Sequence, residues 1–373
     1  MELSNICEYS SKRIDSSLLT VENYVSTENM MQNKGGITLA AKVPVENSVE
    51  FLPGDILISN IRPYFRKIWL SDKKGGCSSD VLCIRALPGT DSAYLYYLLS
   101  QDSFFDYVMS GAKGCKMPRG DKSQIMQWDV DLPNFEEQHR IASILKSIDD
   151  KIQLNNQINH NLEEQAQIVF DRIFNSDLTN NCLLSSIVDI NPKRTLRKNE
   201  VARCIDMTYL NTFGSFPSGW EFKPYSGGMK FINGDTLMAR ITPCLENGKV
   251  AYINFLDKEE TAFGSTEYIV FHAKEGYPNE MFYFLTRNKA FIEFATKNMN
   301  GSSGRQRVSG ETIGNYIIPV LSEDDIHELK TVSESTMKEI LKNNLESRVL
   351  SEMRNTILPK LMSGELKISD LTC

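Results

Sequence analysis

The stretch FLPGDILISNIRP (residues 51–63) recurs in this chain as FINGDTLMARITP (residues 231–243). Each copy has a Phe, a Gly-Asp pair three residues later, an apolar run, and a Pro eight residues after the Asp. Three further matches follow in the same order: SSDVLCIRA (78–86) with STEYIVFHA (265–273), YYLLSQDSFFDYV (96–108) with FYFLTRNKAFIEFA (282–295), and GAKGCKMPRGDKSQI (111–125) with GSSGRQRVSGETI (301–313). Such ordered self-similarity indicates a duplication of a unit of roughly 180 residues.

Each copy ends in a long helical pattern. The first has a seam that steps by four and three residues through Ile141, Leu145, Ile148, Ile152, Asn155, Asn159, Leu162, Ala166, Val169 and Ile173. The second is less regular and passes through Ile326, Met337, Ile340, Leu341, Leu345, Val349, Met353, Ile357 and Leu361, with Pro359 and Gly364 marking its end. Asn134 is the expected N-cap of the first helix, and Ser322 with Asp325 forms a capping box for the second.

A helix with such a seam can pack on its own globular domain or pair with another helix. The length of the first pattern, on the order of 57 Å, its polar Asn positions and the second copy favour an intramolecular antiparallel coiled coil. The predicted fold is therefore α+β, with two globular mixed domains, two long paired helices and an internal pseudo-two-fold repeat. The expected boundaries are a first domain at 1–135, a helical spacer at 136–178, a second domain at 179–321, and a helical spacer with tail at 322–373.

Composition restricts the class of protein. The 373 residues are 41% hydrophobic and 24% charged, which is typical of globular chains. No apolar stretch reaches the ~18 residues of a membrane span, and the first residues do not resemble a signal peptide. The eight Cys are scattered without a CxxC pair, so we expect reduced thiols and a cytoplasmic protein. The net charge of −7 argues against general nucleic-acid affinity but permits a local basic surface.

Complete enzyme signatures are absent from the sequence. It has no GxxxxGK[ST] phosphate loop and no GxGxxG, and Asn191-Pro192 lacks the Pro-aromatic pair of an amino-methyltransferase. Asp206, Glu221 and Lys223 fit the spacing of a metal-dependent nuclease, but many unrelated triples would fit it equally well. The four His residues (139, 160, 272 and 327) have no second ligand at metal-binding spacing, so no metal site is predicted.

Two polar clusters recur at matching places and indicate binding. The first follows the Gly-Asp strand, and the second lies in the glycine-rich loops, where Lys297 also contributes positive charge. Glycine loops let backbone N–H groups approach phosphates, and Arg or Lys can neutralise phosphates or read guanine edges. A single such loop is compatible with a solvated turn, but recurrence in both copies favours DNA contact. The predicted contacts are Arg62, Tyr64, Arg66, Lys67, Lys113, Lys116, Arg119, Lys122, Arg240, Thr242, Ser302, Ser303, Arg305 and Arg307.

Two helical segments carry a family resemblance. LPNFEEQHRIASILKSIDDKIQLNNQINHNLEEQAQIVFDRIF (132–174) closely resembles the central helical region of specificity (S) subunits of type I restriction–modification systems. LESRVLSEMRNTILPKLMSGELKI (345–368) resembles their C-terminal helical region, and the Gly-Asp and glycine-loop motifs resemble those of their target-recognition domains. One departure is that the second helix begins SEDDIHE where the first begins FEEQHRI, so the Glu-Gln element occurs only once.

The resemblance implies a non-catalytic DNA-recognition subunit. Each domain would read one half of a bipartite, asymmetric site in double-stranded DNA, and the paired helices would set the spacing. Two methyltransferase (M) subunits using S-adenosylmethionine and restriction (R) subunits using ATP and magnesium would dock on the helices, and this chain would hold no cofactor. Coiled-coil and subunit contacts are expected at Gln138, Ile148, Ile152, Asn155, Leu162, Leu341 and Leu345. A self-sufficient nuclease or methyltransferase remains the alternative.

Overall fold

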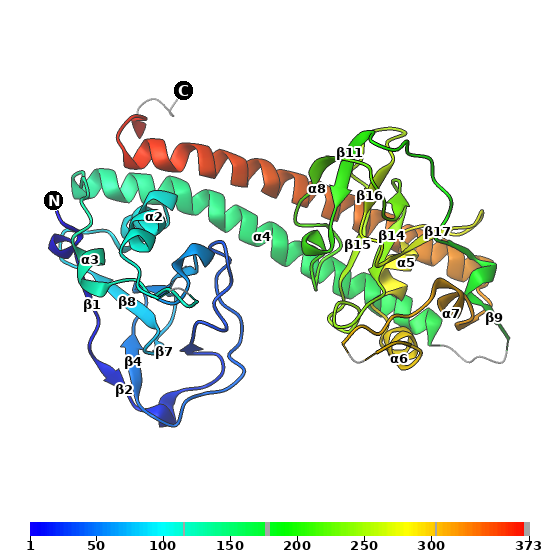
Figure 1. Ribbon diagram of the computed structural model, residues 1–373, viewed down its shortest axis with the longest axis horizontal. Coiled ribbons are helices and arrows are strands. Elements are labelled where there is room, and N and C mark those ends of the chain that lie inside the picture. Colours follow the sequence, from blue (N-terminus) through cyan, green and yellow to red (C-terminus); the bar gives the residue numbers. More distant parts are fainter. Residues whose placement is uncertain (115, 176–179, 303, 369–373) are drawn as a thin grey trace. The chain divides into compact units, whose positions relative to one another are not determined.

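The computed structural model describes residues 1–114, 116–175, 180–302 and 304–368. They form two compact units (Figure 1): unit 1 contains residues 1–151 with the end of the chain from residue 349, and unit 2 contains residues 152–348. Both units combine sheets with helices. The long helices α4 (Phe135–Phe174) and α8 (Glu323–Met362) contribute residues to both units. The predicted α+β class is therefore confirmed.

Unit 1 contains two small sheets flanked by short helices. The first sheet has the order β1 (Cys7–Tyr9), β8 (Val81–Ala86), β5 (Ile56–Ser59), β6 (Ile68–Leu70). The second has the order β2 (Arg13–Ile14), β4 (Ser48–Phe51), β7 (Gly75–Cys77), β3 (Tyr24–Val25). The α-helices are α1 (Ser92–Leu99), α2 (Asp102–Ser110) and α3 (Lys122–Met126), and 3₁₀ helices cover Leu3–Asn5, Ser16–Leu18 and Pro63–Phe65.

Unit 2 is built in the same way. Its first sheet has the order β10 (Val188–Ile190), β17 (Tyr268–Ala273), β14 (Thr236–Ala239), β15 (Val250–Tyr252). The second has the order β12 (Glu221–Pro224), β11 (Val201–Ile205), β16 (Ala262–Gly264), β13 (Lys230–Phe231), and β9 (Asn181–Leu183) pairs with β18 (Ile317–Pro319). The remaining helices are α5 (Met281–Leu285), α6 (Lys289–Lys297), α7 (Gly310–Gly314) and the 3₁₀ helices Leu184–Ser186 and Met207–Tyr209.

The sheets confirm the internal repeat predicted from the sequence. The Gly-Asp segments supply β5 and β14, and each pairs antiparallel with the strand from the second matched segment, β8 or β17. The register is also the same, since Ser59 lies opposite Val81 and Ala239 lies opposite Tyr268. The second sheets share a parallel pair, β3 with β7 and β11 with β16, but the additional outer strand (β2 or β12) lies at opposite edges.

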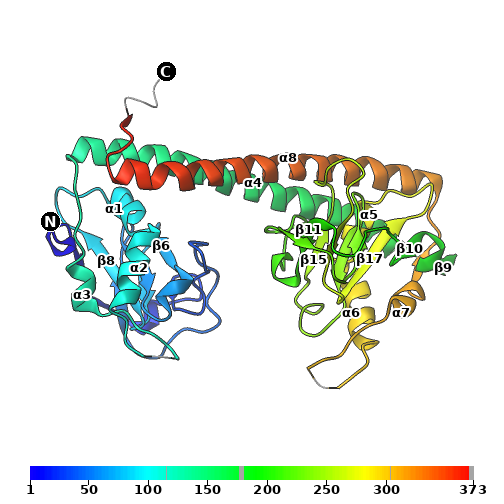
Figure 2. The ribbon, with the colours of Figure 1, turned by 45° about the horizontal axis from the view of Figure 1, so that its top comes forward.

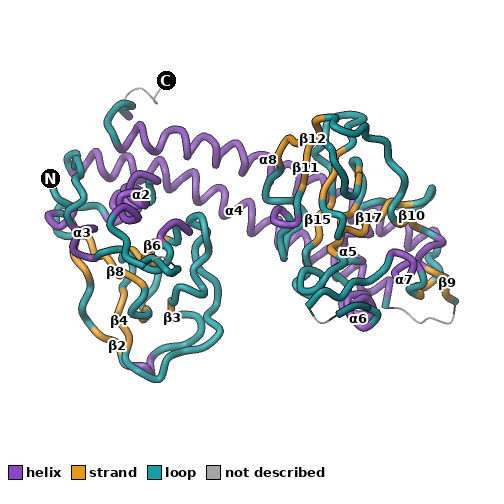
Figure 3. Tube along the Cα trace, viewed as in Figure 1, coloured by secondary structure: helices purple, strands orange, loops and turns teal. Residues whose placement is uncertain are grey.

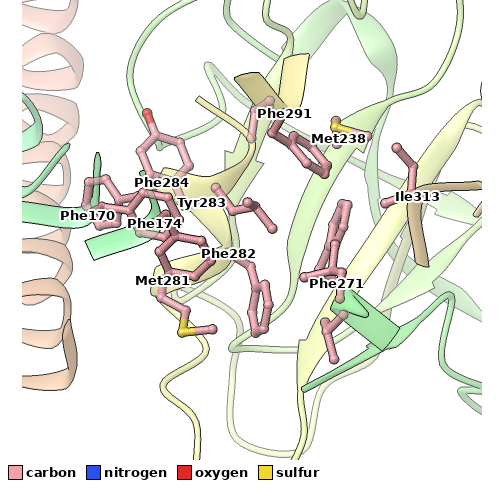
Figure 4. Close-up of a cluster of buried hydrophobic side chains, with 14 of the residues drawn as sticks. Phe170, Phe174, Met238, Phe271, Met281, Phe282, Tyr283, Phe284, Phe291 and Ile313 are labelled. Carbon is pink, nitrogen blue, oxygen red and sulfur yellow. The ribbon is translucent and has the colours of Figure 1, made fainter. Parts of the chain in front are cut away.

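Helix α4 helps to close the core of unit 2. Figure 4 shows Phe170 and Phe174 of α4 beside Phe284 of α5, with Phe271 of β17 deeper in the cluster. The rings of Phe170 and Phe174 stack at 4.0 Å between centroids, and Phe170 lies 6.5 Å from Phe284. In unit 1, Ile141 and Leu145 of α4 are buried in the corresponding cluster. These contacts join the long helix to each unit through apolar packing, the main stabilising term in folding.

Both long helices begin where the sequence predicts. The Asn134 side chain accepts a hydrogen bond from the Glu137 N–H at 3.0 Å. Ser322 and Asp325 form the reciprocal capping box, with N–H to side-chain distances of 3.0 and 3.1 Å. Helix α8 also ends in the predicted region, because it passes through Pro359 and stops at Met362, and Gly364 follows with a left-handed φ of 71°.

Helices α4 and α8 pack antiparallel, as predicted. Within unit 1, Arg354 of α8 binds Asp149 of α4 at 2.6 Å. Within unit 2, Asn155 donates to the Ser347 hydroxyl at 3.1 Å, and Asn343 donates to the Asn159 side-chain carbonyl at 2.9 Å. Partners in α8 therefore have lower residue numbers as the α4 residue number increases. Ile148 is buried, while Ile152, Leu162 and Leu341 are half-buried along the same pair of helices.

The predicted seam of α8 is partly wrong. Leu345, Val349 and Met353 are 44%, 63% and 51% exposed, whereas Asn343 and Ser347 are buried. The physical reason is that Asn155 and Asn159 of α4 require polar partners across the helix pair, which Asn343 and Ser347 provide. The apolar residues at 345, 349 and 353 consequently fall on the outer face of α8.

Gln138 is a structural residue of unit 1. It is 1% exposed, and its side-chain carbonyl accepts the Asp91 N–H at 2.9 Å. Its amide group donates to the carbonyl oxygens of Pro133 and Gly89 at 2.9 and 3.3 Å. All of these contacts are internal, so its side chain secures the start of α4.

Loops and turns make up a large share of each unit, as Figure 3 shows in teal. Residues 26–47 of unit 1 form one long irregular segment between β3 and β4. Across the described parts of the chain, no helix is long and apolar enough to span a membrane. The described thiols of Cys7, Cys77, Cys83, Cys182, Cys204 and Cys244 are free.

Candidate nucleic-acid interface

The Gly-Asp motif fixes the start of the strand that leads to the candidate surface. Asp55 and Asp235 are 2% and 0% exposed. Each carboxylate accepts a backbone N–H from three residues earlier, at 2.7 Å in unit 1 and 2.8 Å in unit 2. Asp55 also binds Arg85, whereas Asp235 binds His272 at the equivalent position of β17. The motif therefore has a structural role: its buried carboxylate is satisfied by a turn and a charged or polar partner.

The glycine-rich segments form short hairpins in both units. Lys113 and Arg119 exchange backbone hydrogen bonds of 2.9 and 3.0 Å and close hairpin 1. Asn300 and Arg307 exchange bonds of 2.9 Å in both directions and close hairpin 2. In Figure 2, the described parts of the segment between α6 and α7 extend away from the strands of unit 2.

Backbone hydrogen bonds join each hairpin to the end of the Gly-Asp strand. In unit 1, the Arg62 N–H donates to the Pro118 carbonyl at 2.8 Å and the Gly120 N–H donates to the Asn60 carbonyl at 3.3 Å. The two polar clusters that were identified separately in the sequence are therefore one continuous surface in unit 1.

Unit 2 repeats this arrangement with different side chains. The Thr242 N–H donates to the Gln306 carbonyl at 3.0 Å, and the Val308 N–H donates to the Arg240 carbonyl at 3.0 Å. Because these bonds are made by the main chain, the same geometry forms although residues 60 and 240, and residues 120 and 308, differ in type.

Arg119 and Arg307, both predicted DNA contacts, are bound to acids of their own units. Arg119 lies 3.0 Å from Asp80, and Arg307 lies 2.7 Å from Glu267. Arg240 approaches the same Glu267 at 3.6 Å. Hydrogen bonds from Arg307 lower the pKa of the Glu267 carboxyl, and the carboxylate in turn raises the pKa of Arg307.

Sequence reasoning missed these two acids. Asp80 and Glu267 occupy the same place in the matched segments SSDVLCIRA and STEYIVFHA, each two residues after a Ser. The Ser hydroxyl accepts the backbone N–H of the acid at 3.3 Å in unit 1 and 3.1 Å in unit 2. Their recurrence beside a recurring Arg was the available signal.

Several other candidates in unit 1 also have internal partners. Lys113 pairs with Asp121 at 2.8 Å, Arg66 pairs with Asp102 at 2.9 Å, and the Lys67 ammonium donates to the Thr27 carbonyl at 2.6 Å. The Lys122 ammonium lies 6.0 Å from the centroid of the Tyr9 ring. These side chains contribute to the local fold, which reduces their availability to a ligand.

Arg62 and Tyr64 border hairpin 1. Arg62 has a left-handed φ of 50°, its guanidinium carbon lies 6.0 Å from the centre of the Phe65 ring, and its Nε is buried without a hydrogen-bond partner among the described residues. Tyr64 is 48% exposed. In unit 2, the Thr242 hydroxyl faces the Met299 sulfur at 3.8 Å, and Lys297 pairs with Glu293 at 3.7 Å.

Each hairpin also carries an exposed cation near its tip. Lys116 in hairpin 1 and Arg305 in hairpin 2 are exposed, and neither side chain has an ion pair or hydrogen bond to another described residue. Ser302 is exposed beside Arg305. The predicted contact at Ser303 lies outside the described residues. Lys116 and Arg305 are thus the candidates whose charge is least compensated within the described chain.

The three residues of unit 2 with nuclease-like spacing, Asp206, Glu221 and Lys223, lie together. The lysine forms ion pairs with both carboxylates. The Lys223 ammonium binds Asp206 at 2.9 Å and Glu221 at 2.8 Å, and the Tyr209 hydroxyl donates to Glu221 at 2.6 Å. The ammonium lies against both carboxylates and compensates their charge. Among the described residues, no group of three or more His, Cys, Asp or Glu side chains is placed to hold a metal ion.

The fold and these surfaces define an internally duplicated α+β protein with two long antiparallel helices. In each unit, backbone hydrogen bonds hold a hairpin to the end of the Gly-Asp strand. The family model described as "Type I restriction modification DNA specificity domain" matches residues 1–164. The chain is 19% identical to the type I restriction enzyme HindI specificity subunit of Haemophilus influenzae, over 98% of each chain. It is 21% identical to the type I restriction enzyme MjaIX specificity subunit of Methanocaldococcus jannaschii, over 95% of this chain and 87% of that protein.

A solved structure shows the same fold. The crystal structure of a type I restriction–modification system S subunit from M. genitalium aligns with a TM-score of 0.60 and 16% identity, over 97% of this chain and 95% of that one. Over nearly its whole length, the chain is similar to type I restriction–modification specificity subunits, and the family model adds the same similarity for residues 1–164.

Proposed function

We propose that this chain reads the DNA sequence for a type I restriction–modification complex. Residues 1–135 and 179–321 are the two target-recognition domains, and each reads one half of a bipartite, asymmetric site in double-stranded DNA. The observation that carries this proposal is the hairpin anchored at the same place in both units, each with an exposed cation near its tip. A duplicated reader with different side chains in each copy suits a site whose halves differ in sequence.

We further propose that segments 136–178 and 322–373 set the distance between half-sites and dock the partners. The partners are two M subunits, which bring S-adenosylmethionine, and R subunits, which bring ATP and magnesium, in the cytoplasm. Leu345, exposed on α8, and the half-buried Ile152, Leu162 and Leu341 are the predicted contact residues that remain accessible. Gln138 and Asn155 are buried, which favours a structural role for both.

The direct test is selection of DNA from a pool of randomised duplexes. The full chain, co-purified with its methyltransferase subunits, should enrich a motif with two short specified parts separated by an unspecified spacer. Sequencing of the methylated sites in the host should return the same motif and should lose it when the gene is deleted. A single uninterrupted motif, or none, would contradict the proposal.

Lys116 and Arg305 give a more local prediction. If each neutralises one phosphate, Lys116→Ala and Arg305→Ala should each reduce the slope of log K against log salt by about 1 and weaken binding for all sequences alike. Exposed Lys42 and Lys258, which lie outside the hairpins, provide matched Lys→Ala controls that should leave the slope unchanged. Unchanged slopes for both hairpin variants would show that the hairpin tips do not contact the backbone of DNA.

A further inference from the structure

We propose that Arg119 and Arg307 are positioning residues that hold the reading hairpins against an acidic turn, and that they do not themselves contact DNA. This inference rests on the proposed function, since it assigns roles within the same surface. It reverses the expectation drawn from sequence, in which both arginines face the ligand.

The first argument is the recurrence of the whole arrangement. In unit 1, the Asn60 N–H donates to the Asp80 carbonyl at 2.8 Å, and its carbonyl accepts the Gly120 N–H. In unit 2, the Arg240 N–H donates to the Glu267 carbonyl at 2.9 Å, and its carbonyl accepts the Val308 N–H. The residue at the end of the Gly-Asp strand therefore ties the acidic turn to the hairpin in both copies.

The second argument is that both partners of each ion pair are held in place. The acid belongs to a turn closed by its own Ser hydroxyl, at residue 78 or 265. The arginine is the closing residue of the hairpin, with backbone bonds in both directions. Two fixed ends lose little conformational freedom when they pair, so the ion pair forms at a lower entropic cost than one between mobile side chains.

The third argument is electrostatic. An arginine that turned toward DNA would leave Asp80 or Glu267 as an unpaired carboxylate beside the phosphate backbone, and like charges repel. In the paired state this acid is neutralised and the exposed cations, Lys116 and Arg305, remain at the hairpin. Within each hairpin, the paired arginine therefore fixes the base, and the exposed cation faces the ligand.

The experiment uses the full chain with its methyltransferase subunits and the randomised duplex pool. Asp80→Asn should lower the preference for the half-site read by unit 1 by about 10-fold, within the range of a lost base contact, and should leave the other half-site unchanged. Glu267→Gln should produce the reciprocal result. Glu275→Gln, which removes an exposed carboxylate of unit 2 outside the hairpin, is the matched control.

The charge swap separates positioning from contact. The double variant Asp80→Arg with Arg119→Glu restores the pair in reverse, and a glutamate at 119 cannot bind a phosphate or a guanine edge. We expect this variant to recover the wild-type motif, while Arg119→Glu alone loses that half-site. Failure of the swap in a chain that melts like the wild type, or an unchanged motif in Asp80→Asn, would overturn the inference. A wild-type chain that selects no bipartite motif would instead overturn the proposed function, and this inference with it.

Discussion

At the scale of single residues, the two copies compensate the same buried aspartate with different partners. The buried carboxylate of Asp55 is compensated by Arg85, at 2.6 and 2.8 Å. Asp235 is compensated by the His272 ring nitrogen at 2.6 Å and by Arg194 at 3.2 Å. Because a buried carboxylate without partners is costly, the partner of each motif Asp is part of the fold.

Replacement of the buried aspartate tests this requirement. Asp235→Asn keeps an acceptor for the Ile232 N–H but removes the charge that His272 and Arg194 compensate, so we expect a loss of about 1–3 kcal/mol in the free energy of unfolding. The measurement is the urea unfolding curve of the full chain. Asp257→Asn, at an 81% exposed side chain paired with Arg203, is the control and should change the curve much less. Equal effects at both positions would refute the structural role of Asp235.

The ion pair at hairpin 2 makes a prediction about pH. Arg307 lowers the pKa of Glu267 below its ordinary value of 4.5. A lowered folded-state pKa means that the pair stabilises the folded chain above pH 4.5, and that this contribution is lost as the pH falls through the folded-state pKa. In a carboxyl-labelled NMR titration, Arg307→Gln should raise the pKa of Glu267 toward 4.5. A pKa that does not change in this variant would place the cause elsewhere.

At the scale of elements, the helix pair contains a buried polar layer between apolar positions of α4. Asn155, Asn159, Asn343 and Ser347 are all buried, and Asn155 is fully so. Its amide nitrogen donates to the Glu346 carboxylate at 2.8 Å and to the Ser347 hydroxyl at 3.1 Å. Buried amides in a helix pair cost stability but specify register, because a shifted pairing leaves them unsatisfied.

The pair Asn159 and Asn343 allows this to be measured. Asn159→Ala leaves the Asn343 amide without its 2.9 Å acceptor, so we expect a loss of about 1–3 kcal/mol in the free energy of unfolding. The double variant Asn159→Leu with Asn343→Leu removes both polar groups and should be close to wild type or more stable. Urea midpoints of Asn159→Leu, Asn343→Leu and the double variant complete the cycle. Additive losses would show that the two side chains do not interact.

The sequence predicted the repeat and α4 well because each rests on a regular pattern. The seam from Ile141 to Ile173 and the caps at Asn134 and Ser322 depend only on local spacing. The face of α8 was not predictable in the same way, because the apolar residues Leu345 and Val349 outweigh Asn343 and Ser347 in any hydrophobic pattern. Only the partner amides of α4 show why the polar face turns inward.

The candidate surface was predicted in composition but not in its internal pairing. Lys116 and Arg305 are exposed as expected, while Arg119 and Arg307 are engaged by acids that lie about 40 residues earlier in the chain. A sequence pattern shows where basic residues occur. It does not show which carboxylates the fold brings beside them. The internal hydrogen bonds of Gln138 were missed for the same reason, since its partners at Gly89 and Asp91 belong to a distant loop.

At the scale of the whole molecule, the duplicated units have diverged at one edge of a sheet. The shared strands of the second sheets keep their pairing, whereas β2 lies beside β4 in unit 1 and β12 lies beside β11 in unit 2. The Lys223 cluster lies on β12, which has no counterpart at that edge of unit 1. Among the described residues, that cluster therefore occurs in one copy and is not part of the repeated surface.

We expect the purified chain to have no catalytic turnover by itself. Incubation with DNA should give no cleavage with magnesium, because Lys223 occupies the position between the two carboxylates. It should give no methyl transfer with S-adenosylmethionine, because Asn191-Pro192 lacks the Pro-aromatic pair of an amino-methyltransferase. Glu221→Ala should leave this baseline unchanged. Turnover that the substitution abolishes would contradict this expectation. Added methyltransferase subunits provide the positive control.

The main-chain attachment of the hairpins has a consequence for how such a protein changes over generations. The bonds from residues 62 and 242 to the hairpins, and from residues 120 and 308 to the strand ends, involve backbone atoms alone. If the hairpins read DNA as proposed, a mutation at an exposed hairpin residue would change what is recognised without removing the bonds that hold the hairpin. Recognition could then change while the fold is preserved, so a new target could be acquired without an unfolded intermediate.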